Sequence, residues 1–176
     1  MRPEDYSWNE HERKMLMTGK AVIPSPRKIA IQDDDEKRLE LEKILEQMSH
    51  KVLALWAMQN SMAFIAYIHL EDDTRKDCVV EETTETFYKR ISGEIGASEL
   101  RKAGFLANTL AKESTSDMSR YAARVYAQAI ATGHMRGHAI VSSDYAIKVV
   151  NLLYPRDMEM IRKTREEQIM LAKTFL

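Results

Sequence analysis

Two histidines have the spacing in this chain that comes closest to a catalytic motif. His134 and His138 lie four residues apart, so a continuous helix would place both imidazoles on one face. Such a pair can hold a zinc ion, and Asp72 or Asp73 could supply a carboxylate ligand from elsewhere in the chain. A divalent ion held in this way would activate a water molecule. One hypothesis is therefore a helical, metal-dependent hydrolase.

The residues around the pair favour a structural role instead. His134 is not followed by the glutamate of the H-E-x-x-H motif, and Gly133 and Gly137 interrupt the helix that the pair would need. Hydrogen bonding at a helix end or within the core is the better explanation. We therefore assign no bound metal and no cofactor, and keep His134 and His138 as weak metal candidates.

No other group of residues forms a catalytic motif. Ser142 and Ser143 lack the Gly-x-Ser-x-Gly context of a nucleophile, and the sequence has no glycine-rich phosphate loop. Cys78 is the only cysteine, which excludes an internal disulfide and a cysteine-based zinc cluster. We assign no catalytic residue and expect a protein that is not an enzyme.

Composition narrows the classes of protein further. The chain has 176 residues, with 26 Lys and Arg against 27 Asp and Glu, so no global basic field attracts nucleic acid. The longest apolar stretch, 52–68, is interrupted by polar residues and is shorter than the roughly 20 residues of a membrane span. Charged residues after Met1 break any export signal. We expect a cytoplasmic protein that binds neither nucleic acid nor membrane.

Helical periodicity dominates the chain after residue 32. Apolar residues and caps predict helices after the acidic run 33–36, over 50–68 and over 73–91, and others that begin at Ser98, at Ser116 or Asp117, before Val141 and at Asp157. We expect the 50–68 helix, apolar nearly all round, at the centre. The fold class is thus all-α: a single domain of about seven helices over 33–176, packed antiparallel or orthogonally.

Residues 1–32 are expected to form a short helix over 7–18 followed by an extended arm. Within the arm, 21–23 and 29–31 either form a strand pair or lie along the outside of the helical body. The composition fits an arm packed on its own domain and an arm exchanged in a homodimer equally well.

A dense charged corner separates two of the predicted helices. It contains Glu71, Asp72, Asp73 and Arg75, and an N-cap with a solvated loop is its simplest interpretation. A loop with this much charge is also suited to recognition. Together with Glu81, Glu82 and Glu85, the acidic residues would attract a basic partner.

From about residue 50 onward, the order of motifs resembles a family of immunity proteins of bacterial polymorphic toxin systems. The first three matching elements are Trp56-Ala57, then Asp73 and Arg75 of a corner whose two prolines are absent here, then Phe87 or Tyr88 followed by Gly93-Glu94-Ile95. The longest match is Ala122-Ala123-Arg124, Gln128-Ala129, Ala131-Thr132, His134, His138-Ala139, Asp144-Tyr145-Ala146 and Lys148, and Arg165-Glu166-x-Gln168 with Leu171 ends it.

The resemblance implies a non-enzymatic protein that binds and neutralises a cognate toxin. Within it, Asp72, Asp73, Arg75, His134 and His138 are expected to cluster, either as a buried polar scaffold or as a partner-binding site. A third hypothesis is a helical scaffold or regulator that binds a partner helix in a methionine-rich groove near Met58 and Met62.

Overall fold

The computed structural model describes residues 23–176, and the predicted helix over 7–18 lies outside them. In the described part, seven α-helices and one short 3-10 helix follow each other with short connections and no strand. The helices are α2 (Asp35–Glu46), α3 (His50–Met62), α4 (Asp73–Ser92), α5 (Ala97–Glu113), α6 (Asp117–Thr132), α7 (His138–Leu153) and α8 (Met158–Lys173), with η2 (Ile65–Tyr67) after α3. The predicted all-α fold is confirmed.

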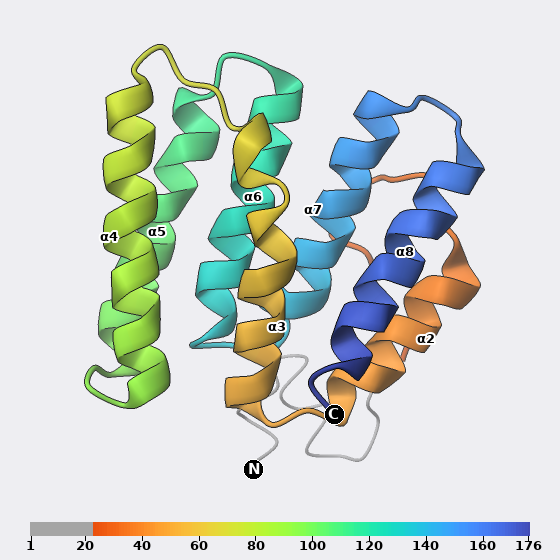
Figure 1. Ribbon diagram of the computed structural model, residues 1–176, viewed down its shortest axis with the longest axis horizontal. Helices are drawn as coiled ribbons and strands as arrows, with labels where there is room; N and C mark the ends of the chain where they lie inside the picture. The colour runs from red at the N-terminus through yellow and green to blue at the C-terminus, as the bar shows by residue number, and fades with distance from the viewer. Residues whose placement is uncertain (1–22) are drawn as a thin grey trace.

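Successive helices from α4 to α8 reverse direction, and each packs on the next (Figure 1). In the view of Figure 1, α5 and α6 lie behind α4 and α3, and α2 pairs with α8. Because the chain reverses at each turn, α4 and α6 both begin at the same end of the molecule. His69, just before α4, donates its backbone N–H to Ser119 Oγ in the first turn of α6, over 2.8 Å.

Polar side chains begin most of these helices. Asp34, Ser49, Asp72, Ser116 and Asp157 each accept a hydrogen bond from a backbone N–H of the first turn. At the other end of α4, Gly93 adopts φ 88°, a left-handed conformation that glycine tolerates best, and closes the helix. These local interactions explain why several helix starts could be predicted from residue types alone. Helix α5, expected to begin at Ser98, begins instead at Ala97 after Gly96, without a side-chain cap.

The core has its centre on α6 rather than on the 50–68 segment. Helix α6 packs against α3, α4, α5, α7 and η2, and its alanines permit close approach. The predicted 50–68 helix is shorter than expected, because α3 ends at Met62. Ser61 Oγ donates to the carbonyl of Met58 over 2.7 Å, a local bond of the kind that competes with helix continuation.

A second cluster of apolar side chains joins α2 and α8 to α3. Trp56 and Leu41 are fully buried there, and the Trp56 indole N–H donates to the carbonyl of Gln168 over 3.3 Å. Burial of a tryptophan and its polar atom together fixes the position of α8 against α3. Among the described helices, none is long and apolar enough to cross a bilayer.

The described part of the arm, 23–32, contains no helix and no strand. Gln32 exchanges hydrogen bonds with Asn151 of α7, at 2.8 and 3.0 Å, and Lys148 donates to the carbonyl of Ala30 over 3.1 Å. The proposed strand at 29–31 is therefore wrong, and residues 21–22 of its proposed partner lie outside the described part of the chain. The alternative, an arm that lies along the helical body, is what the structure shows for these residues.

Candidate functional site

The two histidines lie on either side of a turn and not on one helix. His134 belongs to the turn that follows α6, and His138 is the first residue of α7. Their ring centroids are 5.2 Å apart, and His138 Nδ1 lies 2.6 Å from Oε1 of Gln128. The four-residue spacing therefore brings the rings together through a turn, and the continuous helix that a zinc motif would need is absent.

Two close contacts position this turn. Arg136, between the histidines, is buried and donates to the carbonyls of Leu45 and Met48 at the end of α2, over 3.1 and 2.8 Å. Gly133 packs so close to α5 that a Cβ atom there would lie 2.5 Å from Leu100 Cδ2. The turn is thus held against both α2 and α5.

Both imidazoles are uncharged at neutral pH. Burial, reinforced by the charge of Arg101, lowers the pKa of His134 from 6.5 to about 4. Burial and the neighbouring His134 lower the pKa of His138 to about 3. The pair borders an open cleft of about 400 Å³, whose rim includes Arg101, Phe105 and Arg124. Neutral imidazoles in such a cleft are hydrogen-bonding groups and not general acids at pH 7.

The structure separates the predicted charged cluster into two groups. The Asp72 side chain accepts hydrogen bonds from the backbone N–H groups of Thr74 and Arg75, as an N-cap does. Arg75 lies 3.4 Å from Glu113, and Asp73 lies 3.6 Å from Lys76. These contacts lie at the start of α4, where the side chains of Asp73, Arg75 and Glu113 are exposed.

The histidines lie at the opposite end of α4. Arg90, in the last turn of α4, donates to the carbonyl of Gly133, next to His134, over 3.3 Å. The rise of the helix places Asp73, in its first turn, about 25 Å from Arg90. The expectation that Asp72, Asp73 and Arg75 meet His134 and His138 is therefore wrong. The proposed metal site fails on the same ground, and no group of three potential metal ligands occurs among the described residues.

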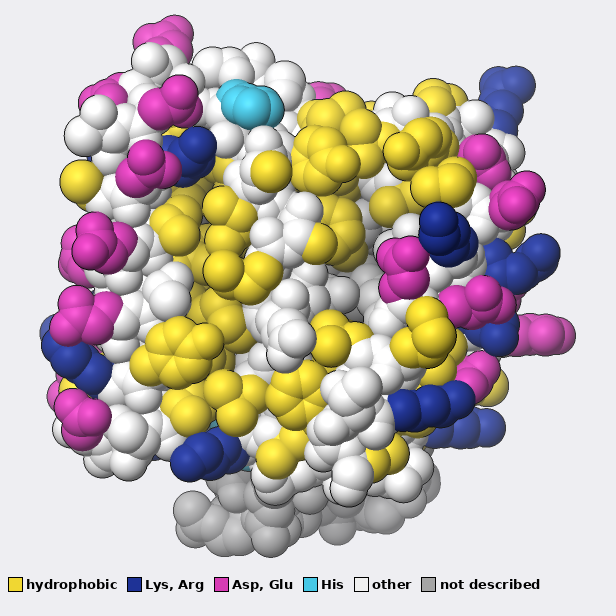
Figure 2. All heavy atoms as spheres, viewed as in Figure 1, with side chains coloured by type: hydrophobic (Ala, Val, Ile, Leu, Met, Phe, Trp, Pro, Cys, Tyr) yellow, Lys and Arg dark blue, Asp and Glu magenta, His cyan; other side chains and the backbone are white. Residues whose placement is uncertain are grey.

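The predicted acidic surface lies on α4 and on the loop just before it. Glu71, Glu81, Glu82 and Glu85 are all exposed, and α4 lies at the edge of the molecule, where acidic side chains line one side (Figure 2). Asp73, Asp77, Glu81 and Glu85 follow each other at four-residue intervals and form one ridge. We call this set the α4 acidic ridge.

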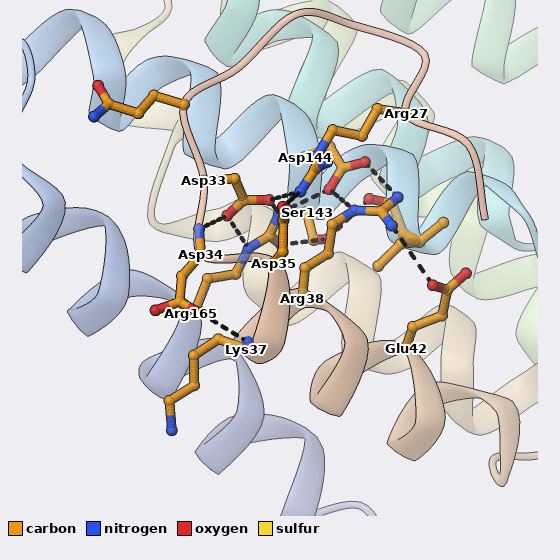
Figure 3. Close-up of polar contacts among 12 residues, drawn as sticks. Arg27, Asp33, Asp34, Asp35, Lys37, Arg38, Glu42, Ser143, Asp144 and Arg165 are labelled. Atoms are coloured by element: carbon orange, nitrogen blue, oxygen red, sulfur yellow. Dashed lines mark hydrogen bonds and ion pairs between the residues drawn. The ribbon is translucent and has the colours of Figure 1, made fainter. Parts of the chain in front are cut away.

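The most extensive polar site is one that the sequence did not reveal. Asp144 of α7 accepts two hydrogen bonds from Arg38 of α2, each 2.9 Å, and a third from Arg165 of α8 over 2.8 Å. Arg165 also binds both carboxylate oxygens of Asp33, at 2.9 and 2.7 Å (Figure 3). At most 3% of any of these four side chains is exposed.

This buried network joins the extended arm to three helices. Ser143 and Gln168 accept further hydrogen bonds from Arg165, and the backbone N–H of Ser25 in the arm donates to Glu42, the neighbour of Arg38. Paired and saturated charges of this kind specify one arrangement of the elements that supply them. The network therefore has the character of a scaffold and not of an exposed binding site.

A comparison with protein families decides the relationship of the chain to other proteins. The family model of the Imm-5 like putative immunity protein matches residues 43–174, about three quarters of the chain. The chain belongs to this family. No curated protein and no solved structure matches it.

The match to the Imm-5 like family covers α3 to α8 in full. It includes the histidine pair, the α4 acidic ridge, and Asp144 and Arg165 of the buried network. Asp33 and Arg38, which complete that network, precede the matched residues. Asp144, Arg165 and Gln168 were part of the sequence resemblance, which was the available signal for the network.

Proposed function

We propose that the chain is a non-enzymatic immunity protein that binds a cognate bacterial toxin domain and thereby neutralises it. Membership of the Imm-5 like family carries this proposal. It acts, on this account, in the cytoplasm of the cell that makes the toxin, as part of a polymorphic toxin system.

The α4 acidic ridge and its neighbours support a toxin with a basic surface. Opposite charge on two partners accelerates their encounter, and it does so most at low ionic strength. Glu81, Glu82 and Glu85 are exposed on α4, at the edge of the molecule, and Glu71 is exposed just before this helix. A nuclease, which needs positive charge to hold its substrate, is one class of toxin with this property.

The arrangement of the remaining polar residues favours binding over catalysis. The carboxylates that a hydrolase would use are at the far end of α4 from His134 and His138. The densest group of charges is the buried network, in which the charged side chains pair with one another and are closed off from solvent. Its members are Asp33, Arg38, Asp144 and Arg165. Such residues serve the stability of a binding surface and do not act on a substrate.

A growth experiment tests the proposal. Each toxin domain encoded beside the gene is expressed alone, with this protein, and with the Asp144→Ala variant, whose fold we expect to be weakened. Survival only in the presence of the intact protein supports the immunity function. Equal toxicity with and without the protein, for every neighbouring toxin domain, contradicts it. An unrelated toxin from another system serves as the control for specificity.

A further inference from the structure

An apolar groove runs along the molecule between α3 and α4. Figure 2 shows a band of hydrophobic side chains there, between the acidic edge of α4 and the middle of the view. Tyr88 of α4 is 51% exposed and Met62 of α3 is 52% exposed. Leu55 of α3 and Val80 and Ile91 of α4 are partly buried and pack against the core. Large apolar side chains gathered on one face mark a site of interaction more often than isolated ones do.

The groove exists because α3 and α4 pack on a common layer. Helix α4 packs on α5 and α6, and α3 packs on α6, α7 and α8. Beneath the groove, the hydroxyl of Tyr126 of α6 lies 2.8 Å from Thr84 Oγ1 and 2.9 Å from the carbonyl of Val80. Helix α6 therefore forms the floor of the groove and is held to α4 by these hydrogen bonds. Helices α3 and α4 form its two walls.

The α4 acidic ridge runs along the outer rim of this groove. Like charges four residues apart on a helix repel, so the ridge destabilises α4 in isolation. Lys76 lies 3.6 and 3.8 Å from Asp73 and Asp77, and Lys89 lies 2.6 Å from Glu85. Among the described residues, Glu81 has no cation within ion-pair distance. Glu81, in the middle of the ridge, thus keeps a charge that no described cation neutralises.

The charge changes sign at the other end of the groove. A hollow of about 300 Å³ is lined there by Lys51 and Ala54 of α3 and by Arg90 and Ile91 of α4. The groove is thus acidic along α4 and cationic at its end. A bound helix has partial positive charge at its amino end and partial negative charge at its carboxyl end, which matches this polarity.

From this combination we propose that the groove binds an amphipathic helix of the partner. The apolar face of that helix covers Leu55, Met62 and Tyr88, its lysines and arginines lie beside the α4 acidic ridge, and its carboxyl end enters the hollow at Lys51 and Arg90. Helices of this type bind grooves through apolar residues at positions i, i+3, i+4 and i+7. The inference rests on the proposed immunity function, because it takes the helix to belong to the toxin.

A synthetic peptide probe tests the groove without knowledge of the toxin. The probe is a helix with leucines on one face and lysines on the other, a free carboxyl end and a fluorescent label. A peptide with glutamates in place of the lysines, and a scrambled basic peptide, are the controls. Fluorescence anisotropy measures affinity, and backbone amide NMR shifts locate the bound peptide. We expect binding by the basic helix alone, with shifts confined to residues of α3 and α4.

Matched variants make the result specific. Tyr88→Asp should weaken binding roughly tenfold, because it replaces a large exposed aromatic side chain of the apolar contact with a charged group. Phe105→Asp changes a side chain that is 64% exposed on α5 and should leave binding unchanged. Thermal melts confirm that both variants fold. Shifts that map to the cleft at Phe105, or equal affinity of the Tyr88→Asp variant, overturn the proposal.

The same variants separate failure of the groove from failure of the immunity function. If the intact protein neutralises its toxin and Tyr88→Asp does so equally well, the groove is not the binding site, although the function stands. If the intact protein neutralises none of the neighbouring toxins, the function itself fails. Loss of neutralisation in Tyr88→Asp alone, with Phe105→Asp fully active, supports both.

Discussion

Asp144 and Arg38 form a bidentate ion pair across 106 residues of sequence, with both N···O distances at 2.9 Å. The exposed fraction of the side chain is 1% for Asp144 and 3% for Arg38. Arg165 donates to the same carboxylate, so one aspartate balances charge from two helices. The stability of the α2, α7 and α8 arrangement consequently depends on Asp144 more than on any exposed ion pair.

Replacement of Asp144 by alanine should lower the free energy of unfolding by about 3–5 kcal/mol, because two buried guanidinium groups lose their shared partner. Urea denaturation followed by circular dichroism measures the loss. Asp73→Ala is the matched control: its side chain is 75% exposed beside Lys76, and the loss should be under about 1 kcal/mol. Similar losses in the two variants would show that the buried network does not hold the fold.

Acid should destabilise the chain through the histidine pair. The pKa values of about 4 and about 3 in the folded state lie below the ordinary histidine value of 6.5. Between pH 4 and pH 6.5, these histidines bind more protons in the unfolded state than in the folded state. The free energy of unfolding therefore falls as the pH is lowered from 6.5 toward 4. Urea midpoints at pH 7 and pH 5 measure this fall.

A variant separates the histidines from the carboxylates, which also begin to titrate at low pH. The double variant His134→Gln and His138→Gln should lose less stability between pH 7 and pH 5 than the intact protein does. Equal losses would mean that the imidazoles keep ordinary pKa values in the folded state.

The α4 acidic ridge should control the rate of toxin binding. Neutralising Asp73 and Glu81 together, as Asn and Gln, should slow association with a basic toxin roughly threefold to tenfold at low salt and flatten its salt dependence. Stopped-flow fluorescence measures the rate. Glu167→Gln, an exposed acid on α8, is the control. Unchanged rates at low salt would remove the ridge from the account.

The same ridge should not contribute to stability. Glu81 has an acidic neighbour four residues away on either side, so Glu81→Gln relieves two repulsions within α4. We expect the free energy of unfolding to stay constant or rise by about 0.2–0.5 kcal/mol. A clear loss of stability in a thermal or urea melt would indicate that Glu81 has a structural partner, and would weaken the argument for a functional ridge.

The features that the sequence predicted well are those decided by residues close together along the chain. Ser116 and Asp157 cap helices where their residue types and the following apolar periodicity placed them, because capping is decided within one turn of the chain. Family membership also followed from the order of short motifs along the chain.

What the sequence could not give is the pairing of distant charges. Nothing near Asp33 or Asp144 identifies Arg165 and Arg38 as their partners, since those partners are far away along the chain. The error over Asp73 and His134 has a simple cause. In an antiparallel array, α4 and α6 run in the same direction, so the start of α4 lies away from the end of α6, where His134 is found.

The most direct test of the central claim is a titration of the purified toxin's activity with the purified protein. A stoichiometric inhibitor removes the activity in a straight line that ends near one equivalent, and the account predicts this result, with a complex of the two chains on gel filtration. Two results would contradict it. Full toxin activity at a large excess of protein would exclude neutralisation by binding, and loss of activity at far less than one equivalent would identify an enzyme.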